Sequence, residues 1–126
     1  MPTTPERPLS PHLQVYRWQV QMLTSILHRA TGAFLCAGLL LLMVALISLS
    51  QGPEQWDHVR AFSSAWYGQC VVLAFIWSLA YHLCNGVRHL LQDLGHGFSV
   101  PEFVRSSWAS LIFSVLCTLV VWVLTH

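Results

Sequence analysis

The sequence has 126 residues, enough for one small domain. It is 55% hydrophobic and only 9% charged, whereas ordinary soluble domains carry about 25% charged residues, so the chain lacks the polar surface of a soluble protein. A net charge of +1 gives no indication of a nucleic-acid-binding surface. The cysteines lie singly inside apolar runs, which predicts buried thiols and no disulfide framework: Cys36, Cys70, Cys84 and Cys117.

Residues 1–21 form a polar amino-terminal arm. Prolines recur there at every third residue, at Pro2, Pro5, Pro8 and Pro11. This spacing favours an extended, polyproline-type chain over a helix. Two interpretations remain open: a disordered tail, and an arm that becomes ordered against a partner.

Three long stretches contain no Asp, Glu, Lys or Arg, and we expect each to cross a membrane. They comprise 24, 27 and 21 residues, at 30–53, 61–87 and 106–126. As helices they would be roughly 36, 40 and 31 Å long, and a bilayer core is about 30 Å thick. Lipid cannot satisfy free backbone amides, so the spans should be helical. The sequence therefore predicts an all-α integral membrane protein with three transmembrane helices, in which residues 1–126 form a single transmembrane domain.

Glycines and prolines set the predicted helix boundaries. Gly52 and Pro53 place a turn at 50–57, and two glycines with Pro101 place a loop at 95–103. This leaves three predicted helices, at about 22–50, 62–94 and 107–124.

The first predicted helix begins with the polar motif SILHRATG, residues 25–32. Ser25 and Arg29 are i, i+4 neighbours on one helical face, and His28 is adjacent in sequence. An arginine, a hydroxyl and an imidazole at the membrane edge can bind a carboxylate or a quinone carbonyl. The alternative is an interfacial arginine that only marks the cytoplasmic border of the span.

The second predicted helix ends in YHLCNGVRHLLQDLGHG, residues 81–97, which contains His82, His89 and His96. Their seven-residue spacing keeps them on nearly one stripe while the helix lasts, with a drift of about 20° per step. His82 lies six residues, or about 9 Å, inside Arg88 along the helix. An ionisable residue at this depth indicates a functional site, and a neutral imidazole is a good ligand for haem iron.

The neighbours of His82 leave alternatives open. Gly86 lies four residues further on the same face and leaves room for a flat, bulky group, or for a close helix–helix contact. His82 itself could instead be a neutral histidine hydrogen-bonded to another helix. His89 lies near the interface, where it could pair with Asp93. The remaining histidines lie at the wrong depth to join His82 on one iron, so we expect a second axial ligand from another chain.

The arginines predict the orientation of the chain. Five lie on the amino-terminal side and one on the other, which places the amino terminus in the cytoplasm, or in the matrix of a mitochondrion. The five are Arg7, Arg17, Arg29, Arg88 and Arg105, and the sixth is Arg60.

Three segments, RPLSPHLQVYR (7–17), SILHRATG (25–32) and YHLCNGVRHLLQDLG (81–95), resemble signatures of the cytochrome b membrane-anchor subunit of succinate dehydrogenase, respiratory complex II. The resemblance covers nearly the whole chain. It implies that the three helices form half of a haem-containing helical bundle, which a second small membrane-anchor subunit completes. It also implies a bacterial cytoplasmic (inner) membrane or, less favoured, the mitochondrial inner membrane.

The same resemblance implies a role in succinate:ubiquinone oxidoreduction. The two anchors would tether an iron–sulfur subunit, which in turn carries a flavoprotein subunit. Succinate would be oxidised at the FAD of the flavoprotein, and electrons would pass through the iron–sulfur clusters to ubiquinone. No residue of the dicarboxylate site would lie on this chain.

For haem b, the resemblance implies that His82 is one axial ligand of the iron and that the partner anchor supplies the other. His28 and Arg29 match family residues near the haem propionates. The residues themselves offer Gly86 as the place where the haem packs against the helix.

For the quinone, Ser25 and Arg29 match family residues that line the binding pocket. Trp18 falls at a position that is aromatic and close to the quinone in the family, which is a weaker correspondence because interfacial tryptophans are common. Asp93 matches an aspartate of the second-helix motif, with a role in structure or in proton supply.

Three other functions are alternatives. A fumarate reductase-type anchor is the same assembly working in reverse. A haem-free structural anchor would use the three helices only to tether an enzyme, with its histidines hydrogen-bonded. A small transporter is disfavoured, because no span contains a buried acid or a break in mid-helix.

Overall fold

The computed structural model describes residues 15–125, which form four helices and no strand. The helices are α1 (Val20–Gln51), α2 (Pro53–Ser64), α3 (Trp66–Asp93) and α4 (Val100–Thr125). The three long helices α1, α3 and α4 contain 32, 28 and 26 residues, whereas a bilayer needs about 20. All three are also apolar enough to span a membrane. The prediction of an all-α chain with three such helices is confirmed.

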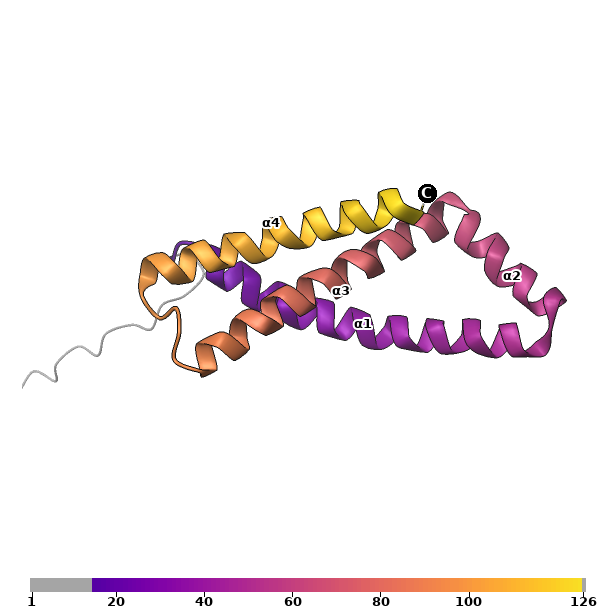
Figure 1. Ribbon diagram of the computed structural model, residues 1–126, viewed down its shortest axis with the longest axis horizontal. Helices are drawn as coiled ribbons and strands as arrows, with labels where there is room; N and C mark the ends of the chain where they lie inside the picture. The colour runs from indigo at the N-terminus through magenta and orange to yellow at the C-terminus, as the bar shows by residue number, and fades with distance from the viewer. Residues whose placement is uncertain (1–14, 126) are drawn as a thin grey trace, which may run out of the picture.

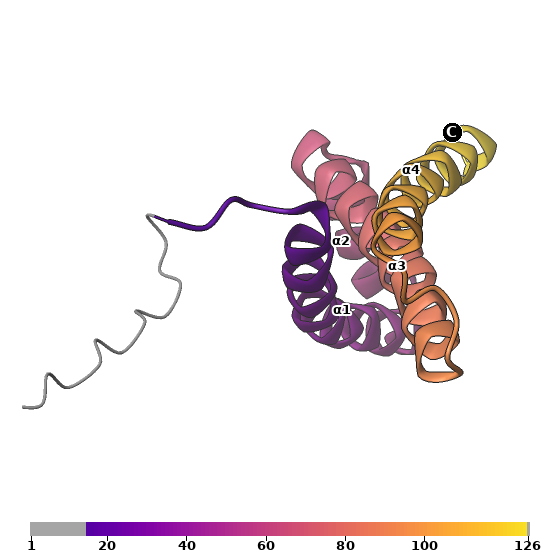
Figure 2. The same ribbon diagram turned by 90° about the vertical axis from the view of Figure 1, so that its left-hand side faces the viewer.

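The helices are arranged with α3 in the centre. It packs against α4 along one side and crosses α1 on the other (Figures 1 and 2). The start of α1, the end of α3 and the start of α4 lie together at one end of the molecule, which we call the site end. At the opposite end α1 and α3 diverge, and α2 connects them. The predicted arm falls largely in residues 1–14, outside the part of the chain that the structure describes.

The segment expected to be a turn at 50–57 is different in the structure. The chain breaks only at Gly52, whose φ of 118° suits glycine, and α2 begins at once with Pro53. Proline is tolerated in the first turn of a helix, because the amide hydrogen that it lacks would have no intrahelical partner there. Glu54 in the first turn also favours the helix amino terminus. The glycine–proline pair therefore separates two helices instead of starting a long loop.

The boundaries of the other helices also differ from those expected. α3 begins at Trp66 because Ala65 before it is extended, with ψ at 150°. α4 begins at Val100, seven residues before the expected 107, and Pro101 occupies its first turn. The Ser99 hydroxyl donates to a Glu102 carboxylate oxygen across that turn, at 2.6 Å.

The side chains buried between the helices are mostly small and polar, whereas the core of a soluble protein is mostly apolar. The only fully buried large aromatic side chain among the described residues is Tyr81. Small hydroxyl side chains line the helix contacts, which lets the backbones approach closely in lipid. They are Thr24, Thr31, Ser78, Ser107, Ser110, Ser114 and Thr118.

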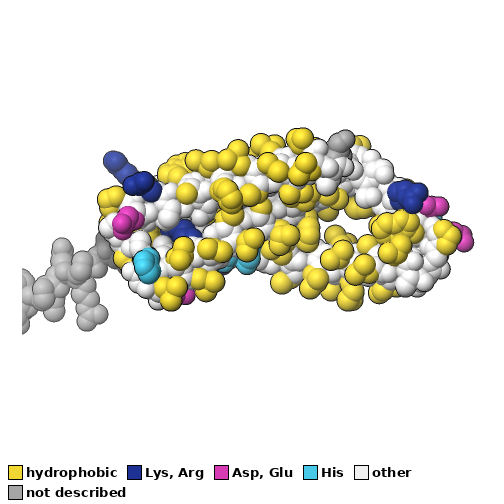
Figure 3. All heavy atoms as spheres, in the orientation of Figure 1, with side chains coloured by type: hydrophobic (Ala, Val, Ile, Leu, Met, Phe, Trp, Pro, Cys, Tyr) yellow, Lys and Arg dark blue, Asp and Glu magenta, His cyan; other side chains and the backbone are white. Residues whose placement is uncertain are grey.

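The outer surface is apolar, as a lipid-facing surface should be. On the face shown in Figure 3, hydrophobic side chains cover the middle of the molecule, and charged side chains gather towards its two ends. This also corrects the prediction that the thiols are buried, since Cys36 and Cys70 are exposed. In a membrane protein an apolar residue can face lipid, so hydrophobicity does not imply burial.

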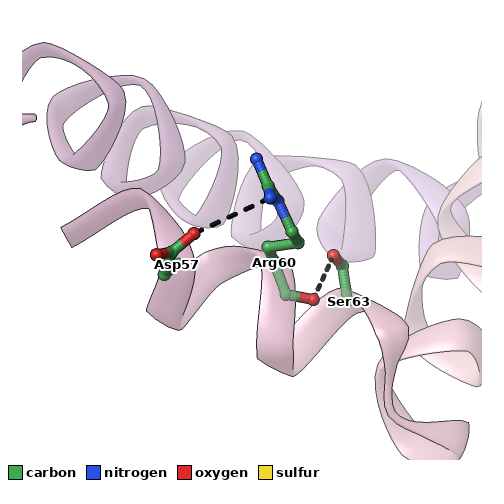
Figure 4. A network of polar contacts seen from close by, with 3 residues as sticks. All are labelled: Asp57, Arg60 and Ser63. Atoms are coloured by element: carbon green, nitrogen blue, oxygen red, sulfur yellow. Dashed lines mark hydrogen bonds and ion pairs between the residues drawn. The ribbon is translucent and has the colours of Figure 1, made fainter. Parts of the chain in front are cut away.

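The end opposite the site end is open. A cavity of about 520 Å³ lies between α1, α2 and α3, and its walls are mostly apolar. Charged contacts there are confined to the surface of α2. Arg60 and Asp57 form an exposed ion pair at 3.8 Å, and the Ser63 hydroxyl donates to the Arg60 carbonyl (Figure 4).

Candidate functional site

Two histidines from different helices meet at the crossing of α1 and α3. The rings of His28 and His82 stack with their centroids 4.0 Å apart and their planes inclined by 10°. A glycine faces each ring. A Cβ on Gly32 would lie 3.1 Å from His82 Cε1, and one on Gly86 would lie 3.8 Å from His28 Cε1. The absence of side chains at these two positions makes room for the pair.

Hydrogen bonds fix the protonated nitrogen of His82. Its Nδ1 lies 3.2 Å from the carbonyl oxygen of His28 and 3.4 Å from the Thr31 hydroxyl oxygen. A carbonyl oxygen can only accept, and the Thr31 hydroxyl already donates to the Leu27 carbonyl at 2.8 Å. The hydrogen of a neutral His82 therefore lies on Nδ1, and the lone pair on Nε2 is available to a metal.

His28 contributes a second polar edge to the site. Its ring meets that of His89 edge-on, with centroids 5.2 Å apart and planes inclined by 61°. Its Nδ1 is buried and has no hydrogen-bond partner within residues 15–125. A buried polar atom of this kind is costly unless a ligand or water satisfies it.

The structure brings Ser25 and Arg29 together as their spacing predicts. The Arg29 guanidinium donates through Nη2 to the Ser25 hydroxyl at 3.1 Å and through Nε to the Ser25 carbonyl at 3.3 Å. Arg29 is exposed and Ser25 is half-buried. Among the described residues no hydrogen bond joins this pair to His82.

The other residues predicted for the site have fewer contacts with the histidine pair. Trp18 precedes α1 and is 61% exposed, with its ring 6.0 Å from that of Tyr16. Gly86 is half-buried beside the His28 ring. The suggested pairing of His89 with Asp93 is wrong, because the His89 Nε2 lies 3.1 Å from the Asn85 amide nitrogen and Asp93 is exposed at the end of α3.

Sequence reasoning missed a buried polar group on α3. Tyr81 is fully buried and donates to the carbonyl of Thr24 at 2.8 Å. Asn85 is also fully buried and accepts from Arg88 at 3.1 Å. In the sequence Arg88 counted only as a border arginine. Its i, i+3 spacing from Asn85, on the face that also bears Tyr81, was the available signal.

The chemistry open to this site follows from its donors. Within residues 15–125 no cluster of three or more His, Cys, Asp or Glu side chains could hold a metal ion by itself. A metal held by one imidazole needs most of its coordination from elsewhere, which suits a porphyrin with a second axial ligand. His82 Nε2, whose lone pair is free, is a nitrogen that could bind such a metal.

Comparisons with known proteins identify the family of this chain. A family model described as "Succinate dehydrogenase/Fumarate reductase transmembrane subunit" matches residues 3–121. The chain belongs to this family. The succinate dehydrogenase cytochrome b556 subunit of Rickettsia prowazekii is 40% identical over 118 residues, covering 94% of this chain and 92% of the relative. The b556 subunit of Paracoccus denitrificans is 37% identical over 121 residues, covering 93% of each.

A mitochondrial relative extends the similarity. The succinate dehydrogenase cytochrome b560 subunit of Sus scrofa is 38% identical over 114 residues, covering 87% of this chain and 66% of the relative. Family membership and the three apolar helices make this chain a multi-pass membrane protein. The names of the relatives connect the family to cytochrome b and to succinate dehydrogenase.

Proposed function

We propose that this chain is a cytochrome b anchor subunit of succinate dehydrogenase and that His82 is an axial ligand of its haem b. The observation that carries the proposal is the contact of His82 Nδ1 with the His28 carbonyl. Histidines that bind metals usually donate their other ring hydrogen to a backbone carbonyl or a carboxylate, which fixes the tautomer and orients the ring. His82 has this arrangement inside an apolar helix.

Other residues of the site fit the same cofactor. Haem b, when bound, supplies a one-electron redox centre within the membrane. The buried, unpartnered Nδ1 of His28 and the exposed guanidinium of Arg29 are suited to hold the carboxylates of the propionates. Gly86 would face the porphyrin, and the second axial ligand would come from the partner anchor subunit.

Ser25 and Arg29 are proposed to bind ubiquinone. A quinone carbonyl that gains electrons becomes negatively charged, and preorganised donors stabilise such a charge. The guanidinium is oriented by its two bonds to Ser25, so little reorganisation is needed when the quinone is reduced. Trp18, exposed just before α1, is the candidate aromatic contact, and Asp93 the candidate for proton supply.

The assembly follows from the surface of the chain. Long apolar faces of α1 and α4 are exposed and suit lipid and a second small anchor subunit. The arginines at the site end favour placing that end, with the iron–sulfur and flavoprotein subunits, on the cytoplasmic side. FAD and the iron–sulfur clusters would belong to those partners.

The haem assignment is tested by replacing His82 with leucine in the assembled complex. We expect the reduced-minus-oxidised spectrum of haem b to be lost or strongly altered, because one axial ligand is removed. The matched control is His58→Leu, since His58 lies on α2 at the opposite end. An unaltered spectrum in His82→Leu would refute the assignment and favour a haem-free anchor.

The quinone assignment has its own test in Arg29→Gln, with Arg60→Gln on α2 as control. We expect Arg29→Gln to lower ubiquinone reduction at least tenfold, while succinate oxidation with an artificial acceptor continues. A tenfold loss corresponds to about 1.4 kcal/mol of transition-state stabilisation. Equal loss of both activities would indicate a defect in assembly instead.

A further inference from the structure

Arg88 is a buried cation that forms no ion pair within the described residues. It is 6% exposed and lies between α3 and α4. Its Nε donates to the Ser106 hydroxyl at 2.9 Å, and its guanidinium carbon lies 4.4 Å from the centre of the Phe103 ring. Its Nη1 donates to Asn85 Oδ1 at 3.1 Å. These contacts hold the guanidinium in one place against two helices.

The contact with Arg88 decides which way the Asn85 amide faces. A guanidinium has donors only, so the atom of Asn85 that faces it must be the carbonyl oxygen. The amide nitrogen of this fully buried side chain then points to His89, with Nδ2 3.1 Å from the ring Nε2. An amide nitrogen can only donate, so His89 Nε2 must be the acceptor.

We propose that Arg88 and Asn85 are positioning residues that hold His89 neutral, with its hydrogen on Nδ1. An imidazolium, or the tautomer protonated on Nε2, would set two donors against each other at this contact. The His89 ring in turn meets the His28 ring edge-on at 5.2 Å. Arg88 thus contacts Asn85, Asn85 contacts His89, and His89 contacts His28 of the stacked histidine pair. We call this series of contacts the relay.

The relay leaves His89 able to donate a hydrogen bond to a ligand at the site, an inference that rests on the proposed function. Through Nδ1 it can serve the site as a hydrogen-bond donor to an oxygen acceptor, but it cannot serve as an acceptor through Nε2, which Asn85 already occupies. The assignment of the tautomer itself needs no cofactor, since it follows from Arg88 and Asn85 alone.

Solid-state NMR of the assembled complex, with ring-¹⁵N-labelled histidine and the haem reduced and diamagnetic, tests the inference. The His89 signals are identified by their loss in His89→Gln. We expect the Nδ1 signal in the range of a protonated ring nitrogen and the Nε2 signal in the range of an unprotonated one. The proposal would be overturned if the unmodified complex showed the reverse pattern or two protonated nitrogens on His89. Neither result would affect the assignment of His82 as a haem ligand.

Two variants test the cause. Asn85→Asp keeps the shape and the bond to Arg88 but offers His89 only an acceptor, so we expect His89 Nε2 to become protonated. In Arg88→Lys the lysine still donates to the Asn85 oxygen, so we expect the protonation pattern of His89 to persist. Arg60→Gln is the control for loss of a distant arginine. An unchanged His89 pattern in Asn85→Asp, or a lost one in Arg88→Lys, would contradict the relay. Haem b absorbance in each sample reports separately on the proposed function.

Discussion

The two ends of the molecule are held together in different ways. At the site end, hydrogen bonds join one helix to another, as from Tyr81 to Thr24 and from Arg88 to Ser106. At the opposite end, α1, α2 and α3 surround an apolar cavity of about 520 Å³, and the Gln69 side chain of α3 donates to the Ser63 carbonyl of α2. Polar contacts between helices are therefore concentrated where side chains must be held in a fixed geometry.

Close packing at glycines is a second feature of the end opposite the site end. Glycine lets the chain approach itself closely there, as where the Phe75 ring lies against Gly38 and the Phe62 carbonyl lies against Gly68. Lipid tails are as apolar as the side chains, so no hydrophobic driving force brings the helices together, and close packing is one of the sources of stability that remain. Several hydrogen bonds between helices therefore orient side chains at the site end, whereas the opposite end combines close packing at glycines with the bond from Gln69 to Ser63.

The largest effect on stability is expected from Gly68→Ala. The new Cβ would overlap the backbone carbonyl of Phe62, and a backbone atom cannot move aside as a flexible side chain can. Overpacking typically costs about 1–3 kcal/mol, and we expect the upper part of that range. Thermal unfolding of the complex in detergent measures it, with the exposed Ser64→Ala at the end of α2 as control. An unchanged melting temperature would show that the α2–α3 corner is not tightly packed.

Gly32→Ala should act on the site without unfolding the chain. The added carbon would lie 3.1 Å from His82 Cε1, so the ring must shift by a few tenths of an ångström. We expect assembly to be retained and the haem b absorption band or midpoint potential to change. If both stay as in the unmodified complex, Gly32 does not position the His82 ring.

Tyr81→Phe removes one hydrogen bond between helices and leaves the ring in place against Trp77. The lost bond, at 2.8 Å to the Thr24 carbonyl, is buried. Such bonds contribute about 1 kcal/mol in membrane proteins, so the expected loss of stability is smaller than for Gly68→Ala. Denaturant or thermal unfolding measures this loss. A cost comparable to that of Gly68→Ala would contradict the division between the two ends.

The smallest effect is expected from Arg60→Gln. The side chains of Arg60 and Asp57 are 66% and 68% exposed, and exposed ion pairs contribute between 0 and about 1 kcal/mol. We expect no more than about 0.5 kcal/mol in the same unfolding measurement. A larger loss would show that the α2 surface is buried against a partner in the complex.

The sequence predicted the spans but only part of the site. Stretches without charge set the three long helices, because a single segment can satisfy its own backbone hydrogen bonds across lipid only as a helix. The pairing of Ser25 with Arg29 followed from i, i+4 spacing within one helix, and the structure shows that bond. Helix α2 was missed because Gly52-Pro53 was interpreted as a loop, although proline also begins helices.

Contacts between helices could not be derived from spacing. The stacking of His28 on His82 and the bond from Asn85 to His89 depend on how α1 and α3 cross and rotate. A sequence of mostly apolar residues on all faces gives no period from which that rotation could be determined. Arg88 shows the same limit, since an arginine near a span end can turn towards the interface or, as here, into the bundle.

The most direct test of the account is a cryo-electron microscopy structure of the intact complex at a resolution that shows the haem and its ligands. The account predicts continuous density from His82 Nε2 to the iron, His82 Nδ1 facing the His28 carbonyl, and a second axial ligand from another polypeptide. A porphyrin bound by other residues, or an intact complex in which His82 faces only protein or lipid, would contradict it.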